Sequence, residues 1–328
     1  MYKILTILFI IPFLTSCFKE DEPIQPNSQN SITVPESIYT HQSFFDFATS
    51  QIVSVNPVEI WDLGFESSAN GWHIIINSGK YLGVYSSGTT DFDGLTSVPL
   101  SARWKFDKSD GNPDSTAIGK WISQQSNLPT NEVYVIGVND GVKYSPFKKI
   151  VFTSLTAGVY SFSFANMDGT GSGTFSITKD PTKNNVYFSF SDGGKEVTVE
   201  PSKNGWDFVF TQYSTILYTD EGIPTPYFVR GVLSNPNGVE VALDTLTGFA
   251  NITSADISNL QFSAKYDAIG YDWKSVIIEG TTATYAVRPK YSYVIKSTHG
   301  LYYKLRFTGF FSDQGSPGYP RFEVKELL

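Results

Sequence analysis

The sequence is poor in the residues that form disulfides, metal sites and basic surfaces. Its 328 residues include one cysteine, three histidines and two methionines, and charged residues make up 17%. A single cysteine excludes disulfides within the chain, cysteine zinc sites and iron–sulfur clusters. The net charge of −8 and the pI near 5.0 argue against nucleic acid as a partner, because phosphate binding needs a basic surface.

The sequence motifs of common enzyme classes are also missing. Gly169–Gly173 (GTGSG) has glycine where a G-x-S-x-G nucleophile belongs, and no phosphate-binding glycine loop is present. Asp110–Asp114 (DGNPD) resembles the first half of a calcium loop, but Ser115 and Trp121 occupy the positions of the required Gly and Glu. We interpret it as an acidic surface loop, with a loose calcium site as the alternative. We expect a protein that is not an enzyme.

Aromatic residues are abundant, and they alternate with turn-forming segments. The chain has 19 Tyr and 25 Phe, and 41% of its residues are hydrophobic. Aromatic and β-branched runs separated by Gly, Asn, Asp and Pro predict an all-β fold of antiparallel strands. Asn235–Gly238 and Thr298–Gly300 have the composition of turns that close hairpins. The one helix candidate beyond the N-terminus is Ala255–Leu260, with Thr253 or Ser254 as its cap.

The N-terminus has the three parts of a lipoprotein signal peptide. Met1–Lys3 is short and positive, and Ile4–Leu14 is apolar but shorter than the roughly 20 residues that span a bilayer. Leu14–Cys17 (LTSC) then matches a lipobox, in which small residues precede the cysteine. We predict that residues 1–16 are removed and that Cys17 carries the lipid.

Residues 17–37 predict a lipidated tether. Phe18–Glu22 contains an acidic cluster that resembles a surface-export signal, with an ordinary charged tether as the alternative, and Pro23–Ser37 has the composition of a flexible spacer. We expect an outer-membrane lipoprotein, exposed on the cell surface, that contacts the membrane through its lipid anchor only.

An internal repeat organises the rest of the chain. An aromatic segment followed by a Trp-Asp pair occurs at Ser43–Ala48 and Trp61–Phe65, and again at Val186–Ser191 and Trp206–Phe210. A repeat of this length indicates a duplicated domain rather than a solenoid. We predict two similar β domains at residues 38–181 and 182–328. The repeat places Asp62 and Asp207 in different domains, so we do not expect them to form a carboxylate pair. We expect each carboxylate to accept a hydrogen bond from a nearby backbone amide.

These landmarks resemble a known family. Trp-Asp-x-x-Phe after an aromatic strand, then Asn77–Gly79, the Gly231–Val239 turn (GVLSNPNGV) and the closing strand pair are similar to HmuY-like lipoproteins of Bacteroidota. The resemblance covers roughly residues 40–328, once per half. It implies two tandem all-β domains and a haemophore role, in which haem is held at the cell surface and passed to a TonB-dependent outer-membrane receptor.

The resemblance does not supply the haem ligands. The best-known family member uses two axial histidines, but the corresponding segments, Thr96–Val133 and Phe208–Ser292, contain neither His nor Met. Of the three histidines, His73 is the candidate, because it lies on an alternating strand beside apolar residues. The alternative is a half-buried strand histidine with a local hydrogen bond.

We therefore expect a surface protein that binds haem. The alternative is a binding protein for a glycan or another protein that has lost haem ligation. The remaining candidates are less suited to bind iron, since His41 lies at the start of the first strand and His299 and Met167 lie in turns.

Overall fold

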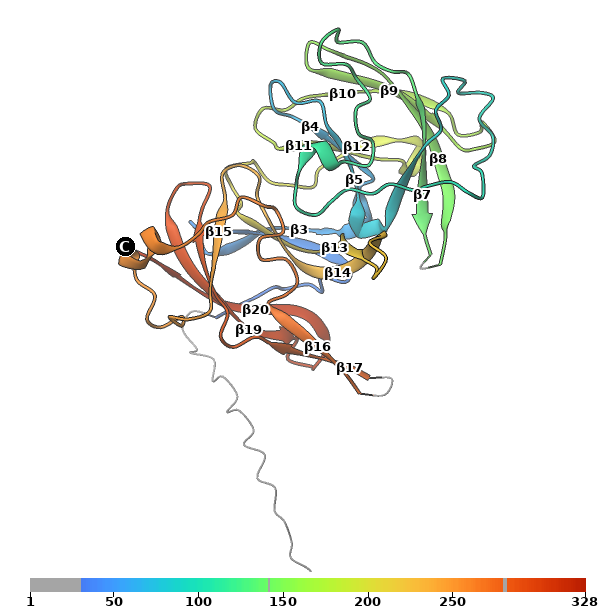
Figure 1. Cartoon of the computed structure of the whole chain (residues 1–328). Coiled ribbons are helices and arrows are strands. Elements are labelled where there is room, and N and C mark those ends of the chain that lie inside the picture. Colours follow the sequence, from blue (N-terminus) through green and yellow to red (C-terminus); the bar gives the residue numbers. More distant parts are fainter. Residues whose placement is uncertain (1–30, 141, 280–281) are drawn as a thin grey trace, which may run out of the picture.

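The computed structural model describes residues 31–140, 142–279 and 282–328, which form two β-rich lobes (Figure 1). The predicted signal peptide, Cys17 and the tether up to residue 30 lie outside the described residues. Within those ranges, no helix is long and apolar enough to cross a membrane. The sheets are antiparallel throughout, so the predicted all-β fold class is confirmed.

Lobe 1, residues 58–197, contains a four-stranded sheet in the order β12-β11-β4-β5 and a five-stranded sheet in the order β10-β9-β8-β7-β6. Its strands are β4 (Leu63–Glu66), β5 (Ile74–Ile76), β6 (Leu82–Ser86), β7 (Val133–Asn139), β8 (Tyr144–Thr156), β9 (Val159–Ala165), β10 (Gly173–Thr178), β11 (Asn185–Ser189) and β12 (Lys195–Val197).

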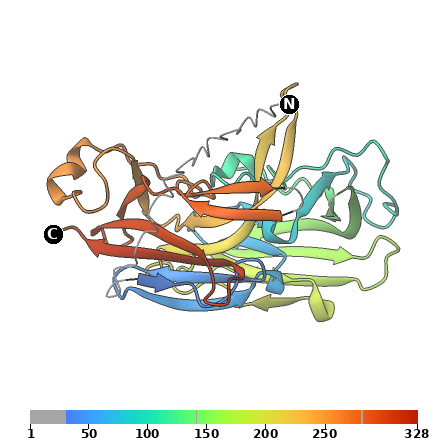
Figure 2. The same ribbon diagram turned by 90° about the horizontal axis from the view of Figure 1, so that it is seen from below.

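Lobe 2, residues 31–57 and 198–328, contains a four-stranded sheet in the order β14-β13-β2-β3, a five-stranded sheet in the order β1-β20-β19-β18-β15, and the ribbon β16-β17. Its strands are β1 (Ser31–Thr33), β2 (His41–Asp46), β3 (Gln51–Pro57), β13 (Phe208–Tyr218), β14 (Pro224–Ser234), β15 (Glu240–Asp244), β16 (Lys274–Glu279), β17 (Thr282–Val287), β18 (Ser292–Lys296), β19 (Tyr302–Phe311) and β20 (Pro317–Glu326). Figure 2 shows β13 and β14 extending beyond the body of the molecule as a ribbon.

The helical elements of the described residues are short 3-10 helices. They are η1 (Val58–Ile60), η2 (Ser78–Lys80), η3 (Pro113–Ser115), η4 (Ser191–Gly193) and η5 (Ser254–Asn259). The last agrees with the predicted short helix: the Thr253 backbone N–H donates to the Asp256 carboxylate over 2.8 Å, which caps the turn.

The two copies of the repeat exchange strands. In copy one β2 and β3 precede β4 and β5, and in copy two β11 and β12 precede β13 and β14. Yet β2 pairs with β13 and β11 pairs with β4. Each four-stranded sheet therefore combines the first two strands of one copy with the next two of the other. The predicted boundary between residues 181 and 182 stays a prediction, and these pairings run across it.

Each lobe buries its own core. Lobe 1 packs aromatic residues of β8, β9 and β11 around Phe65 and Trp121, and all of this cluster lies within residues 58–197. Lobe 2 packs Phe45 and Phe47 of the first copy against Phe208, Phe210 and later strands of the second. The aromatic richness of the sequence is thus mostly core, as alternating buried strands require.

One of the two predicted hairpin turns is confirmed and the other is wrong. Residues 297–301 connect β18 to its neighbour β19, with Ser297 N donating to Leu301 O over 2.8 Å. Asn235–Gly238 instead connects β14 to β15, which belong to different sheets. Its composition does give a turn, but the Asn235 side chain bonds the chain before β13, so the following strand leaves the sheet.

Candidate functional site

The two Trp-Asp pairs bind the strands that the copies exchange. Asp62 Oδ2 accepts from Phe190 N over 2.7 Å, at the end of β11. Asp207 Oδ2 accepts from Phe47 N over 2.8 Å, at the end of β2. The expectation that each aspartate bonds a backbone amide is confirmed, and the amide comes from the other copy. Each carboxylate has a further partner, Lys80 for Asp62 and Thr298 for Asp207.

Two asparagines, one after β5 and one after β14, make equivalent hydrogen bonds in the two copies. Asn77 Nδ2 donates to Val58 O and Trp61 O over 2.8 and 2.9 Å. Asn235 Nδ2 donates to Lys203 O and Trp206 O over 2.8 and 2.7 Å. Sequence reasoning had noted these two asparagines only as separate landmarks. The hydrogen bonds show that they are equivalent residues of the two copies.

A small aromatic cluster fills the centre of this junction. Trp61 packs edge-on against Tyr187, with ring centroids 4.8 Å apart, and Trp206 packs edge-on against Phe44 at 5.0 Å. Each tryptophan therefore contacts the aromatic strand of the other copy. The cluster is separate from the cores of the two lobes.

A cavity of about 510 Å³ lies between the lobes beside this cluster. Its lining comes from both copies: the strands at Glu66, His73 and Asn77, the segment 107–116, and the strands and loops at Glu200, Trp206 and Tyr213. A cleft of this size with aromatic walls and a few polar groups has the properties of a small-molecule site. Glycine at Gly64 keeps this wall compact, because a Cβ there would lie 2.7 Å from Ile75 Cγ1.

His73 lines the cavity and is held by Glu66. The Nδ1 atom lies 2.5 Å from Glu66 Oε2, and the imidazole packs on the Trp72 ring at 4.1 Å between centroids. His73 is half-buried, and within the described residues its Nε2 makes no hydrogen bond. Burial pushes the pKa of Glu66 upward, but hydrogen bonds from His73 and Ser68 hold that pKa down at about 2. The partner of the imidazole is therefore an ionised carboxylate.

The second copy has no equivalent of this pair. The strand register places Thr211 opposite Gly231 in β13 and β14, where the first copy has Glu66 and His73. Gly231 is required there, because a Cβ would lie 2.2 Å from Gly270 O of the crossing chain. The framework is duplicated, but the histidine face of the cavity belongs to copy one alone.

Two more carboxyl groups reach the cavity with raised pKa values. Burial raises the pKa of Asp107 to about 7, although Ala117 N and Ile76 N both donate to it. Burial raises the pKa of Glu200 to about 7, against the hydrogen bonds from Asn184 and Asn185. The cavity therefore gains negative charge as the pH rises through neutrality.

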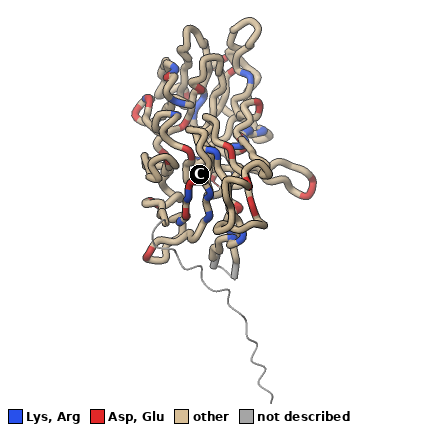
Figure 3. Tube along the Cα trace, turned by 90° about the vertical axis from the view of Figure 1, so that its left-hand side faces the viewer, with Lys and Arg blue, Asp and Glu red and all other residues tan. Residues whose placement is uncertain are grey.

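Lysines and tyrosines complete the polar lining. Lys108, Lys183 and Lys203 stand beside the acidic groups, and acidic and basic positions are interspersed along the rest of the chain (Figure 3). Burial raises the pKa of Tyr213 and Tyr266, so both phenols stay protonated near neutral pH. Tyrosinate ligation of iron, which the abundance of tyrosine left open, is disfavoured at these two positions.

The calcium-like segment is a capped turn that bridges the lobes. Asn112 Oδ1 accepts from Asp114 N over 3.1 Å and caps η3, while Ser109 Oγ donates to Asp267 Oδ2 over 2.6 Å. Among the described residues, no group of three or more His, Cys, Asp or Glu side chains could hold a metal ion.

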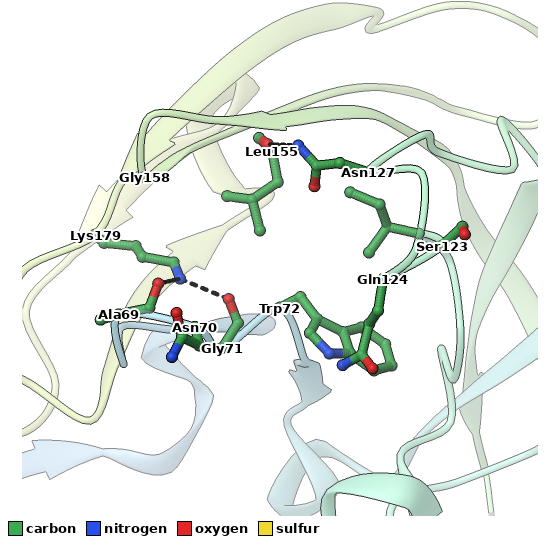
Figure 4. Close-up of a pocket in the computed structure, with 11 residues that line it drawn as sticks. Ala69, Asn70, Gly71, Trp72, Ser123, Gln124, Asn127, Leu155, Gly158 and Lys179 are labelled. Atoms are coloured by element: carbon green, nitrogen blue, oxygen red, sulfur yellow. Dashed lines mark hydrogen bonds between the residues drawn. The ribbon is translucent and has the colours of Figure 1, made fainter.

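A second pocket, of about 430 Å³, is lined by the loop at Ala69–Trp72, by Leu155 and by Lys179 (Figure 4). Trp72 forms part of its wall, so Trp72 and His73 face different pockets. The Lys179 ammonium donates to the carbonyls of Ser68, Ala69 and Gly71 over 2.5–3.3 Å and fixes the loop. The lysine is already satisfied, and the remaining polar lining is largely exposed.

The other sequence candidates lie away from the inter-lobe cavity. His41 contacts Thr40 Oγ1 at 3.0 Å, His299 is exposed in the β18–β19 turn, and Met167 lies in the turn after β9. Cys17 lies outside the described residues. Sequence reasoning missed Glu66, Asp107 and Glu200, since their proximity to His73 depends on which strands pair.

Comparison with known proteins identifies the family. The family model described as HmuY protein matches residues 38–164 and 181–324. No curated protein matches the chain.

Three solved structures are among the matches, and all are distant. They are a protein assigned as HmuY-like and haem-binding from Bacteroides vulgatus (14% identity, 54% of this chain and 90% of that chain, TM-score 0.24), the apo HmuY analog of Tannerella forsythia (11%, 91% and 95%, 0.25) and apo PinO from Porphyromonas gingivitis (8%, 91% and 96%, 0.26). Because each TM-score is below 0.5, we base no argument on these matches. The two matched segments cover most of the sequence, and the chain therefore belongs to the HmuY family, as two tandem copies.

Proposed function

We propose that this protein is a non-enzymatic, lipid-anchored surface protein that holds haem in the inter-lobe cavity. Membership of the HmuY family supports a binding role, and the resemblance to HmuY-like lipoproteins implies haem as the ligand. The observation that carries the proposal is the Glu66–His73 pair: His73 lines the cavity, and within the described residues its Nε2 makes no hydrogen bond.

This pair has the arrangement that iron ligation requires. A histidine that ligates a metal usually donates its other ring N–H to a carboxylate, which fixes its tautomer and raises its basicity. Glu66 stands in that position, and histidine is a common axial ligand of haem iron. Trp61, Trp206 and Phe44 supply apolar contact for the macrocycle. We propose one protein ligand, since the other histidines and Met167 lie elsewhere.

The finer parts of the proposal concern location and partner. Cys17 would anchor the chain in the outer membrane, facing outward, and a TonB-dependent receptor would accept the haem. Both rest on the N-terminal sequence and on the family resemblance.

Titration with haemin, followed by the Soret band, tests the ligand. We expect a saturable, red-shifted band in the wild type and in H299A, whose exposed histidine is the matched control. In H73A the shifted band should be lost. In E66Q the affinity should fall by about 10–100-fold, as for other residues that orient a metal ligand.

Iron-free protoporphyrin tests whether the cavity binds the porphyrin ring without a bond from His73 to iron. It should quench tryptophan fluorescence equally in the wild type and H73A, because ring contacts do not need the imidazole. If haem does not bind with its iron either ferric or ferrous, and protoporphyrin does not bind either, the haem proposal is wrong. A glycan or protein ligand then becomes the better hypothesis.

A further inference from the structure

Within the part of the chain that the structure describes, the side chain of Arg230 has no partner for its hydrogen-bond donors. It lies on β14, where it pairs with Gln212, and its side chain is on the opposite strand face from Tyr213. Within the described residues its guanidinium makes no hydrogen bond and no ion pair, and its Nε is buried. Guanidinium is always charged and carries five N–H donors, so a buried, unpaired Nε calls for an explanation.

Aromatic rings fix the plane of this guanidinium. Its Cζ lies 4.4 Å from the centroid of Tyr39 and 4.8 Å from that of Phe228. Phe228 stacks in turn on Tyr81 of lobe 1 at 5.0 Å, and Tyr39 is held by a 3.0 Å hydrogen bond to Tyr285. With rings packed against it and Nε buried, the guanidinium is left with the edge formed by its two Nη atoms as the part that can bind a partner.

A lysine that is only partly charged near neutral pH lies beside Arg230. Lys274 Nζ donates to Arg230 O over 2.6 Å and, within the described residues, has no carboxylate partner within ion-pair distance. Asp272 is the acidic group that acts on Lys274, and burial lowers the pKa of that lysine to about 7. Two other arginines lie over a ring. Arg306 over Phe249 has a carboxylate partner, Glu323 at 2.7 Å, and Arg288 over Tyr291 donates its Nε–H to Asp272 O over 2.7 Å.

We propose that the edge of Arg230 is a binding site for an oxyanion, a phosphate or carboxylate group, at the surface of the lobe junction. A planar fork held in advance suits bidentate contact with such groups, and the side chain loses little further entropy on binding. This site is distinct from the proposed haem site, because Arg230 is not among the residues that line the inter-lobe cavity.

The test follows the Nε–Hε resonances of Arg230 and Arg306 by NMR in the purified wild-type protein. Inorganic phosphate and succinate are titrated separately at constant ionic strength, with sodium chloride as the reference. We expect the Arg230 resonance to shift and saturate in the millimolar range with at least one oxyanion, while Arg306 does not move. A response to phosphate alone identifies phosphate groups as the ligand, and a response to succinate alone identifies carboxylates.

An Arg230 resonance that stays unmoved, or that moves equally with chloride, would overturn the proposal. Variants give an independent readout in thermal unfolding. The same oxyanion should raise the melting temperature of the wild type and of R306K above the chloride value. In R230K, which keeps the charge but loses the fork, that increment should disappear.

Discussion

At the scale of single residues, burial of charge decides how the molecule responds to pH. Glu200 is 3% exposed and faces the cavity, and its pKa of about 7 lies above the value of about 4.3 expected in an unfolded chain. The folded state therefore holds the proton more tightly than the unfolded state. Stability is greatest below about pH 4.5 for this group and falls as the pH rises through 7.

We predict that E200Q removes part of this pH dependence. The free energy of unfolding of the wild type should fall between pH 5 and pH 7, and the variant should lose about 1–3 kcal/mol less over the same interval. Asp107, with a similar pKa, leaves a residual slope. Urea unfolding at the two pH values measures this, and equal slopes in the two proteins would contradict the assignment.

Asp207 makes the second prediction at this scale. Its carboxylate accepts from Phe47 N, Thr298 N and Thr298 Oγ1, all within 2.9 Å. D207A leaves these buried donors without an acceptor, so we expect a loss of about 2–4 kcal/mol in the free energy of unfolding. D220A, at an exposed hairpin tip, is the control and should change stability by less than about 0.5 kcal/mol. A loss as small in D207A as in D220A would show that the bonds do not hold the exchanged strand.

Sequence reasoning predicted the chemistry of some residues better than it predicted which residues would contact them. The two aspartates were expected to bond backbone amides, and they do. For His73 the sequence left two interpretations, a haem ligand or a half-buried strand histidine with a local hydrogen bond; the hydrogen bond to Glu66 is present, and ligation stays a prediction. Glu66 was not linked to His73, since the pairing of β4 with β5 brings together residues on either side of a loop. The local pattern reports exposure and turn type, but not this contact.

At the scale of elements, the exchange of strands is what the sequence could not reveal. The aromatic strand of either copy has the composition to pair with either Trp-Asp strand, because the copies are alike. Repetition therefore predicts which strands are equivalent, and not which of them meet. In space, residues 58–197 close lobe 1 on their own, whereas lobe 2 is assembled from both sides of them.

Two fragments of similar length distinguish the sequence repeat from the spatial lobe. We predict that residues 58–197 fold alone, because they contain both sheets and the whole core of lobe 1. Residues 38–181 lack β11 and β12 and expose Phe45 and Phe47, so this fragment should show no cooperative unfolding. Thermal unfolding followed by circular dichroism compares them. A stable 38–181 fragment beside an unfolded 58–197 fragment would contradict the pairing described above.

At the scale of the whole molecule, the junction holds the lobes together and forms the cavity. Gln212 Nε2 donates to Gly79 O, and Ser214 Oγ donates to Ser78 O, both over 3.0 Å, so η2 of lobe 1 is fixed on β13 of lobe 2. Because its walls come from both lobes, the cavity exists only in the intact chain. A ligand bound there should also resist separation of the lobes.

Anchoring is the remaining prediction at this scale. If Cys17 is acylated, the protein purified from its membrane should carry an N-terminal lipid at that residue, visible by mass spectrometry. The C17S variant should be released into the soluble fraction. A wild-type chain that carries no acyl group would remove the lipoprotein part of the proposed function and leave the cavity argument unaffected.

The position of bound iron tests the central claim most directly. Crystals of the protein grown with haemin, measured at the iron absorption edge, locate the metal independently of the protein atoms. The account predicts a single anomalous peak in the inter-lobe cavity, at bonding distance from His73 Nε2, with Glu66 still bonded to Nδ1. Iron in the pocket beside Lys179, at the surface, or bound without His73 would contradict it.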